Sequence, residues 1–292
     1  MHDFMMRFLC LILFVAGSGM FGCSNQASQT VNDNAEKGTP SPNDKFPTEG
    51  KPETVQLLNE PIRHLLSGDA IQPHVTVDTK SNIYVAYLHK GNIVVSASTD
   101  RGASFAPPVV AIDNKGHARG GRQRGPRIGV GANQQLVVTA PLTFDPEQWK
   151  QKYPRAELYT VSATDGGKTW SVPIRINEKE KRAPEALHWL AVAPSGVAVV
   201  AWLDIRDRDR GQDIYFARIA NGKVSPNTSI ERTVCECCAP GLAVDDRGNP
   251  FLGFREGGKS GSREIFVSHS TDGGKSFSKR TQINQQRSQE YG

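Results

Sequence analysis

Arginine side chains are concentrated in a few segments of this 292-residue chain, and arginine is well suited to holding anions. The segment 114–127 contains six basic residues and no acid, whereas 204–210 mixes aspartate with arginine. Because a guanidinium can pair with two oxygens of a carboxylate, sulfate or phosphate, these segments predict an anion-binding surface. The alternative is a set of solvated charges, partly paired with one another in 204–210. The candidate ligand-binding residues are Arg122, Arg124, Arg127, Arg206, Arg255 and Arg263.

Three of the five cysteines fall within four positions, at Cys235, Cys237 and Cys238. We favour one disulfide with one free thiol, because the export signal described below places the chain in an oxidising compartment. The alternative is a soft-metal site for copper or zinc, with His188 or His117 as a further ligand. The sequence has no Cys-x-x-Cys-His motif, so covalent haem is not indicated, and no cofactor is firmly predicted.

The N-terminus predicts export. Arg7 precedes an apolar run of signal-peptide length that ends in Met20-Phe21-Gly22-Cys23, which resembles a bacterial lipobox. We therefore expect residues 1–22 to be a lipoprotein signal peptide and Cys23 to carry the lipid, with an ordinary secretory signal as the alternative. Ser24, where an Asp would retain the protein at the inner membrane, favours sorting to the outer membrane. The expected location is the cell envelope, facing the periplasm or the cell surface.

Residues 23–52 contain almost nothing apolar, so they cannot bury enough surface to offset the entropy of ordering. We expect a flexible tether there and a folded part over 53–292. Its 28 glycines, 18 prolines and 37% hydrophobic residues favour an all-β fold with many turns. The net charge of +5 lacks the clustered excess typical of nucleic-acid binders, so no nucleic-acid partner is expected.

One short motif occurs three times. Ser98-Thr99-Asp100-Arg101-Gly102-Ala103-Ser104-Phe105 recurs at 163–170 and again at 270–277. This is the Asp box, a hairpin turn in which the carboxylate accepts backbone N–H groups and the aromatic ring packs on the sheet. Asp100, Asp165 and Asp272 are therefore assigned a structural role.

The spacing of these boxes predicts a fourth unit. The second and third boxes are much further apart than the first and second, and a shortened box at Asn221-Gly222-Lys223 lies between them. Inner strands are expected near His74, Arg127, His188 and Gly241. Four-stranded sheets repeated at this interval predict β-propeller blades, over about 70–112, 126–176, 187–232 and 240–284.

Over residues 70–284 the chain resembles the sialidase superfamily, and in particular lipoproteins with BNR (Asp-box) repeats. The resemblance implies a six-bladed, sialidase-like propeller, of which this chain has four blades, so we expect it to be incomplete. The stretch Thr54–Leu58 is a candidate outer strand for closing a complete ring. Relatives with this Cys-x-Cys-Cys blade tend to have a further Cys at the next inner strand, which would make the disulfide partner one that is missing here.

The match to an active sialidase site is partial. Members of the family carry Arg-Ile-Pro at an inner strand, but Gly129 follows Arg127-Ile128 here. The resemblance implies Arg206 or Arg255 as a second arginine and Asp145 or Glu147 as a carboxylate, while the tyrosine nucleophile would belong to the absent blades. No catalytic residue is assigned. We therefore expect a propeller that binds an anionic small molecule or glycan, with an exo-α-sialidase-type glycoside hydrolase as one alternative and a metal- or redox-handling envelope protein as the other.

Overall fold

The computed structural model describes residues 69–121, 123–152, 154–178, 187–206, 211–257 and 264–284. The predicted signal peptide, Cys23, the tether and the stretch Thr54–Leu58 lie outside these residues. No helix in the described ranges has both the length and the apolar character needed to cross a membrane.

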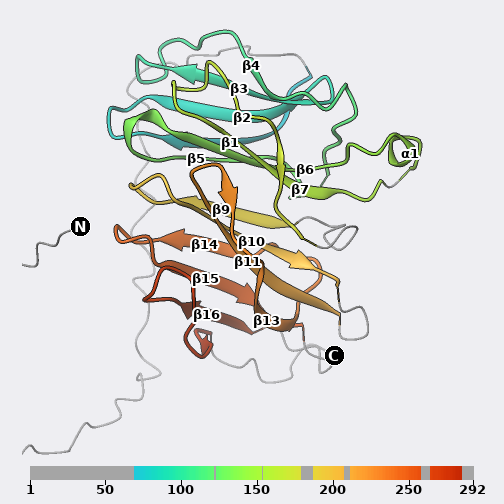
Figure 1. Cartoon of the computed structure of the whole chain (residues 1–292), viewed down its shortest axis with the longest axis vertical. Coiled ribbons are helices and arrows are strands. Elements are labelled where there is room, and N and C mark those ends of the chain that lie inside the picture. Colours follow the sequence, from blue (N-terminus) through green and yellow to red (C-terminus); the bar gives the residue numbers. More distant parts are fainter. Residues whose placement is uncertain are drawn as a thin grey trace, which may run out of the picture. The chain divides into compact units, whose positions relative to one another are not determined.

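The fold is all-β and consists of four antiparallel sheets, as the sequence predicted (Figure 1). The first sheet contains β1 (Ile71–Val77), β2 (Ile83–His89), β3 (Asn92–Ser98) and β4 (Val109–Ile112). The second contains β5 (Arg127–Val130), β6 (Leu136–Leu142), β7 (Glu157–Ala163) and β8 (Ile174–Arg175). The third contains β9 (His188–Val192), β10 (Ala198–Asp204), β11 (Gln212–Ala220), β12 (Lys223–Val224) and β13 (Thr228–Val234). The fourth contains β14 (Gly241–Val244), β15 (Pro250–Arg255), β16 (Ile265–His269) and β17 (Thr281–Gln282).

Two short helices lie in the second sheet's loops, namely the 3-10 helix η1 (Ala132–Gln134) and α1 (Pro146–Trp149). The strands expected near His74, Arg127, His188 and Gly241 are β1, β5, β9 and β14, each the first strand of its sheet. Each sheet therefore has the strand order of a propeller blade.

The third sheet has five strands where four were expected. Both β12 and β13 pair with β11, at Ile219↔Val224 and at Gln212↔Val234. They cover successive parts of one edge, and Pro226 lies in the gap between them. Because proline has no N–H to donate to a ladder, the outer strand is interrupted there.

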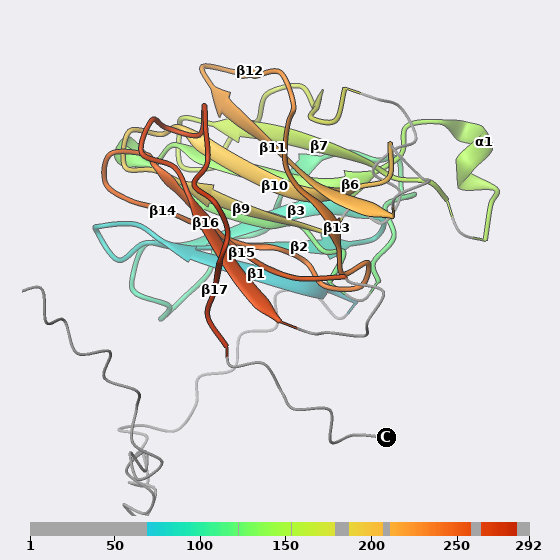
Figure 2. The same ribbon diagram turned by 90° about the horizontal axis from the view of Figure 1, so that it is seen from below.

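Consecutive sheets pack face to face, from β1–β4 at the top of Figure 1 to the sheet of β14, β15 and β16 at the bottom. Figure 2 views the sheets from below, so that their strands lie over one another. Apolar residues on alternate strand positions form a core at each junction. Leu88 and Ile128 meet between the first and second sheets, and Leu158 and Trp202 between the second and third. Phe216 and Phe254 belong to the core between the third and fourth sheets.

Some apolar side chains on the outermost sheets remain exposed. Val75 and Val77 on β1 are 57% and 54% exposed, and Phe251 on β15 is 42% exposed. The four blades and these exposed faces are consistent with the expected incomplete propeller.

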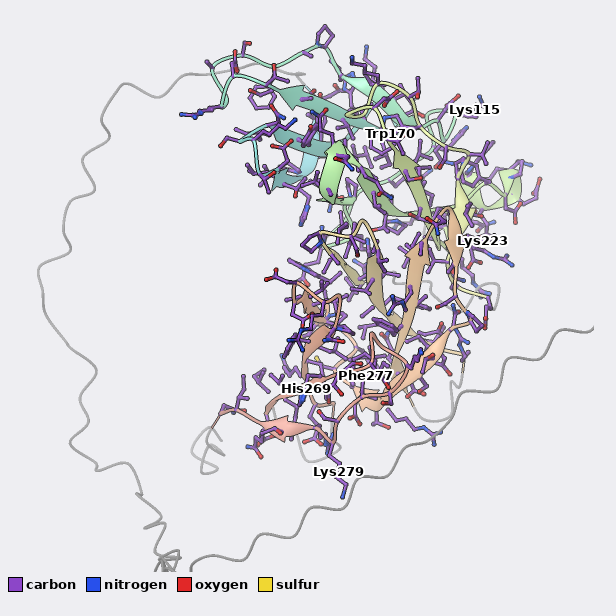
Figure 3. The ribbon with its side chains drawn as sticks, turned by 60° about the vertical axis from the view of Figure 1, so that its left-hand side comes forward. Lys115, Trp170, Lys223, His269, Phe277 and Lys279 are labelled. Carbon is purple, nitrogen blue, oxygen red and sulfur yellow. The ribbon has the colours of Figure 1, made fainter. Side chains whose placement is uncertain are left out.

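The turns at Asp100, Asp165 and Asp272, which we call the Asp turns, share one geometry. In each, the carboxylate accepts the backbone N–H and the side-chain hydroxyl of the Ser or Thr four residues later. The side chains of Trp170 and Phe277, labelled in Figure 3, belong to two of these turns and pack against the cores. Hydrogen bonds from the Ser104 side chain and backbone, with a further one from Ser98, lower the pKa of Asp100 to about 2.

Candidate functional site

Strand pairing places Arg127, Arg206 and Arg255 at the same end of the strands in their sheets, and we call this end the arginine edge. Antiparallel strands run in opposite directions, so β5 begins at the end of its sheet where β6 ends, and β14 begins where β15 ends. Arg127 begins β5 and Arg255 ends β15, so both lie at this edge. The Asp turns lie at the opposite ends of the sheets. The loops at the arginine edge are therefore the candidate functional surface.

Loops from the second and fourth blades touch at this edge. Gln123, in the loop before β5, accepts a hydrogen bond from the backbone N–H of Ala239 at 3.4 Å. The backbone carbonyl of Gln123 also accepts from the Arg127 guanidinium at 3.4 Å. Ala239 directly follows Cys238, whose sulfur accepts from the Arg255 guanidinium at 3.3 Å. Arg127 and Arg255 are thus connected through a short chain of contacts, and we call the surroundings of these two residues the central arginine site.

Arg127 is buried, with 9% of its surface exposed. Its Nη atoms donate to the backbone carbonyls of Pro126 and Gln123, and its guanidinium lies 4.9 Å from the centre of the Trp189 ring. Its Nε has no hydrogen-bond partner, and no carboxylate of the described chain pairs with this residue. Burial lowers the pKa of Arg127 from its usual value, although arginine stays charged. A buried positive charge without an acid is costly and calls for an anion.

His74 on β1 completes the surroundings of Arg127. Its Nδ1 accepts the backbone N–H of Ile128 at 3.2 Å, so this nitrogen carries no proton. Its ring meets the Trp189 ring edge-on, with 5.9 Å between centres. Burial, and then the charge of Arg127, lower the pKa of His74 below its usual 6.5. The histidine is therefore neutral at neutral pH and adds no second charge beside the arginine.

Arg255 resembles Arg127 in that its Nε is buried without a hydrogen-bond partner. No ion pair joins it to a carboxylate in the described ranges. Among the described residues, its guanidinium donates to the sulfur of Cys238. Arg127 and Arg255 thus each have a buried Nε donor without a hydrogen-bond partner.

The three cysteine sulfurs form a triangle. The distances are 3.5 Å for Cys235–Cys237, 3.3 Å for Cys235–Cys238 and 4.0 Å for Cys237–Cys238, and no disulfide joins them. Burial opposes ionisation of Cys235, but hydrogen bonds from the neighbouring cysteines and the charge of Arg255 outweigh it and lower its pKa. Burial, together with the hydrogen bond and charge of Cys235, raises the pKa of Cys238 to about 11. The cluster therefore favours a thiolate on Cys235.

The two histidines that were considered as further metal ligands are elsewhere. His188 lies within 3.0 Å of the Thr139 hydroxyl through Nε2, and the ring of His117 stacks on Trp149 at 4.0 Å. Among the described residues, the group that could hold a metal contains only the three cysteines. The expectation that His188 or His117 completes the site was wrong, because strand pairing in β9 and the α1 insertion hold them away.

A pocket of about 450 Å³ lies beside the loop 114–124 and the insertion around α1. We call it the loop pocket. Arg124 lines it, and Arg119 donates to the backbone carbonyls of Trp149 and Gln151. No acidic residue is among its lining residues in the described chain. The lining residues are Asn114, His117, Ala118, Arg119, Gly120, Gly121, Arg124, Pro141, Leu142, Thr143, Lys152, Pro154 and Ala156.

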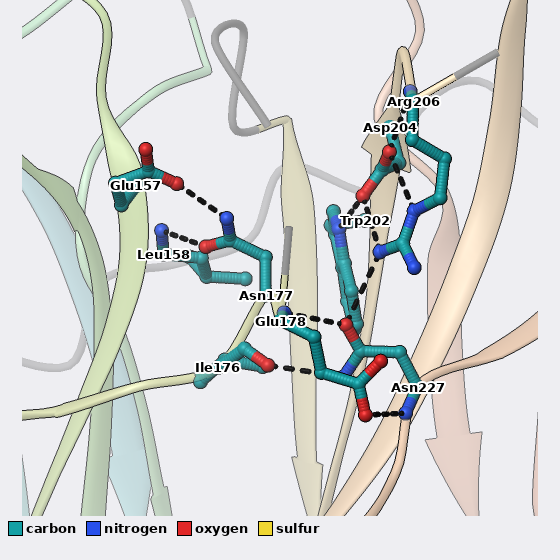
Figure 4. A network of polar contacts seen from close by, with 9 residues as sticks. All are labelled: Glu157, Leu158, Ile176, Asn177, Glu178, Trp202, Asp204, Arg206 and Asn227. Carbon is teal, nitrogen blue, oxygen red and sulfur yellow. Dashed lines mark hydrogen bonds and ion pairs between the residues drawn. The ribbon is translucent and has the colours of Figure 1, made fainter. Parts of the chain in front are cut away.

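Arg206 does not have the free guanidinium that was expected of a ligand-binding arginine. Its guanidinium makes two hydrogen bonds with Asp204, from Nε at 3.0 Å and from Nη2 at 2.8 Å (Figure 4). The guanidinium also lies 3.6 Å from the centre of the Tyr215 ring. Nη2 also donates to Asn227 at 3.1 Å. Asp204 is fully buried, and Trp202 donates to it at 3.1 Å. The guanidinium of Arg206 therefore neutralises the buried carboxylate of Asp204.

Figure 4 also shows how this network joins the second and third blades. Asn227 donates to the backbone carbonyl of Ile176 at 3.0 Å and accepts the backbone N–H of Glu178 at 2.8 Å. Asn177, which is buried, accepts from Leu158 and donates to the carboxylate of Glu157. These contacts are structural, and they hold the chain after β8 against the segment before β13.

Two further candidates from the sequence have local roles. The Asp145 carboxylate caps α1 by accepting the N–H of Glu147, and Glu147 pairs with Lys150 at 2.7 Å. Neither carboxylate is tied to the central arginine site by any contact in the described chain. Arg122 and Arg263 lie outside the described residues.

Sequence reasoning missed His74, Trp189 and Gln123 as members of this site. His74 and Trp189 appeared only as parts of predicted inner strands. The available signal was their position, because side chains at the start of successive inner strands meet at one edge of a propeller. Gln123 carried no signal, since its contact with Ala239 joins loops that are distant in sequence.

No model of a known protein family matches the chain, and no curated protein matches it. Similar solved structures include the "Hadza microbial sialidase Hz136", with 17% identity over 74% of this chain and 46% of that chain and a TM-score of 0.47. An ulvan lyase from a new polysaccharide lyase family is 14% identical over 74% of this chain and 56% of its own, with a TM-score of 0.48. An intramolecular trans-sialidase from Ruminococcus gnavus is 11% identical over 73% of this chain and 70% of its own, with a TM-score of 0.44. This chain spans about half the length of the first two. These similarities concern the fold alone.

Proposed function

We propose that this protein binds an acidic carbohydrate at the central arginine site. The observation that carries the proposal is the buried guanidinium of Arg127, which has no carboxylate partner in the described chain and an Nε without any hydrogen bond. A ligand carboxylate or sulfate would supply the missing negative charge and accept these donors. Arg255 offers a second guanidinium on the same edge of the sheets.

Three features support a sugar acid as the anion. The guanidinium of Arg127 lies over the ring of Trp189, and this partly buried indole offers apolar surface next to the charge. The neutral His74 offers a polar neighbour without adding repulsion or charge. The Asp turns resemble those of the sialidase superfamily, whose ligands are acidic sugars. The loop pocket has Arg119, Arg124 and Lys152 among its lining residues.

We assign binding rather than hydrolysis to this chain. Asp145 and Glu147, the carboxylates considered for a sialidase-type acid, cap and flank α1, and Gly129 stands where the family has a proline. A general acid must lie within hydrogen-bond reach of the reacting group, and these two have no contact with Arg127 or Arg255.

The test is a calorimetric titration of the parent protein with N-acetylneuraminic acid, glucuronic acid and, as the neutral control, N-acetylglucosamine. Binding of an acidic sugar that weakens as salt is raised supports the proposal, because screening shortens the range of charge–charge attraction to about 8–10 Å. Equal binding of the neutral sugar would contradict it. Turnover of a fluorogenic sialoside by the parent would replace binding with catalysis as the function.

We further propose that the protein is anchored in the cell envelope by a lipid on Cys23. The lipobox-like run before Cys23 supports this, as does the polar stretch 24–52, which suits a tether. Cys23→Ser should move the protein from the membrane fraction to the soluble fraction. Identical fractionation of the variant and the parent would rule out the anchor.

A further inference from the structure

We propose that Cys235, Cys237 and Cys238 form a binding site for a soft monovalent metal ion, with copper(I) as its occupant. The three sulfurs lie between 3.3 and 4.0 Å from one another. A metal ion about 2.3 Å from each of three sulfurs, the usual zinc–thiolate bond length, spaces those sulfurs by roughly 4 Å. Small side-chain rotations therefore bring all three thiols to bonding distance of one ion.

The backbone around the cysteines holds this triangle in place. The N–H of Cys235 donates to the carbonyl of Arg255 at 3.0 Å, and Ala239 is held by Gln123 at the other end of the motif. Gly257 packs so closely that a Cβ there would lie 2.3 Å from the carbonyl oxygen of Val234. The cysteine segment is thus held at its start by Arg255 and Gly257 and at its end by Gln123, as a preorganised metal site requires.

The number of ligands favours copper(I) over zinc. The metal-ligating group of the described residues contains three cysteines and no histidine or carboxylate. Structural zinc sites are almost always four-coordinate, whereas thiolates select soft ions such as copper(I), which is satisfied by three sulfurs. Cys235 is buried and Cys237 is exposed, so an ion can enter from solvent at Cys237 and be held at the buried end.

The charge balance also fits. Binding exchanges three thiol protons for one copper(I) ion, with no change of oxidation state, and leaves a complex of net charge −2. The guanidinium of Arg255 lies 3.3 Å from the sulfur of Cys238 and offsets part of this charge. Arg255 also belongs to the central arginine site. When the metal site is occupied, the Arg255 guanidinium would pair with the negative copper–thiolate complex, and Arg127 would be the principal anion-binding group.

The test uses the full-length protein, reduced and kept free of oxygen, titrated with copper(I) in competition with bicinchoninate. We expect one ion per chain, bound by sulfur alone in its X-ray absorption spectrum. Cys235→Ser, Cys237→Ser and Cys238→Ser should each lower the affinity by more than about 100-fold, the upper range for losing a mere outer-shell partner. Glu236→Gln, within the same segment, is the matched control and should stay within about twofold. Circular dichroism of each variant checks that the fold persists.

Failure of copper(I) to compete with bicinchoninate in the folded parent would overturn the proposal. So would equal retention of copper by all three serine variants, or zinc bound as tightly as copper(I). A disulfide between two of the cysteines in protein isolated from cells without reductant, together with an absence of bound copper, would show that the cluster serves as a covalent link instead. None of these outcomes depends on whether a sugar binds at Arg127.

Discussion

Gln123 and Ala239 are 116 residues apart in the sequence, yet the side-chain oxygen of the first accepts the backbone N–H of the second at 3.4 Å. This contact joins the loop before β5 to the cysteine segment before β14. The carbonyl of Gln123 also accepts from Arg127, so one residue contacts both the anion site and the residue that follows the cysteines. The anion site and the metal site are therefore neighbours on one edge of the propeller blades.

Arg206→Ala should destabilise the fold rather than act on the ligand. The substitution leaves the buried carboxylate of Asp204 without its cationic partner, and breaking such a pair costs about 3–5 kcal/mol. Arg206→Lys, which keeps the charge but not the fork, should lie between the parent and the alanine variant. Urea unfolding measures the difference, with the exposed Arg232→Ala on β13 as a control expected within about 0.5 kcal/mol of the parent. A stable Arg206→Ala variant with weakened sugar binding would return Arg206 to the ligand site.

His74 should make the protein less stable in mild acid. Its folded-state pKa lies below 6.5, so its contribution to stability is complete above pH 6.5 and is lost as the pH falls from there toward the folded pKa. Protonation also removes the acceptor for the Ile128 N–H and places a second cation beside Arg127. The melting temperature should therefore fall as the pH is lowered below 6.5, and His74→Gln should shrink that fall. An unchanged pH dependence in the variant would refute this role of His74.

Ser104→Ala should raise the pKa of Asp100. The hydroxyl of Ser104 is the largest cause of the low value of about 2, and the backbone N–H of the same residue remains in the variant. Because the pKa is depressed in the folded state, the stability of this turn is present above the usual value of about 3.8 and is lost as the pH falls through about 2. Carbon-13 NMR of the carboxyl group follows the titration. Ser276→Ala, in the turn of Asp272, is the matched control and should leave Asp100 unchanged. A pKa of Asp100 that does not respond to Ser104→Ala would contradict this assignment.

The parts of the fold that depend on local sequence could be predicted. The Asp turns form from residues within eight positions, and alternating apolar residues mark the strands, so four sheets and their first strands followed from the sequence. The sequence also contains a second turn motif, an Asp followed four residues later by an Asn. Asp78 and Asn82 form the same pattern of hydrogen bonds between β1 and β2 that Asp245 and Asn249 form between β14 and β15.

The candidate site could be predicted only in part, because its contacts join different blades. The sequence indicated Arg127 and Arg255 but gave no means to separate them from Arg206, whose partner Asp204 lies two positions away among several other acids. The structure shows that the Arg206 guanidinium pairs with Asp204, the buried last residue of β10. Trp189 approaches Arg127 because neighbouring inner strands pack together, which residue spacing does not encode.

The central claim is that Arg127 binds the acidic group of the ligand, and the most direct measurement is calorimetry of Arg127→Ala with the acidic sugar that the parent binds. We expect a loss of roughly 1.5–3 kcal/mol in binding free energy, the range for hydrogen bonds to charged groups. Arg232→Ala should bind as the parent does, and circular dichroism should show both variants folded. If folded Arg127→Ala binds the acidic sugar as tightly as Arg232→Ala, the anion does not lie at Arg127 and the account is wrong.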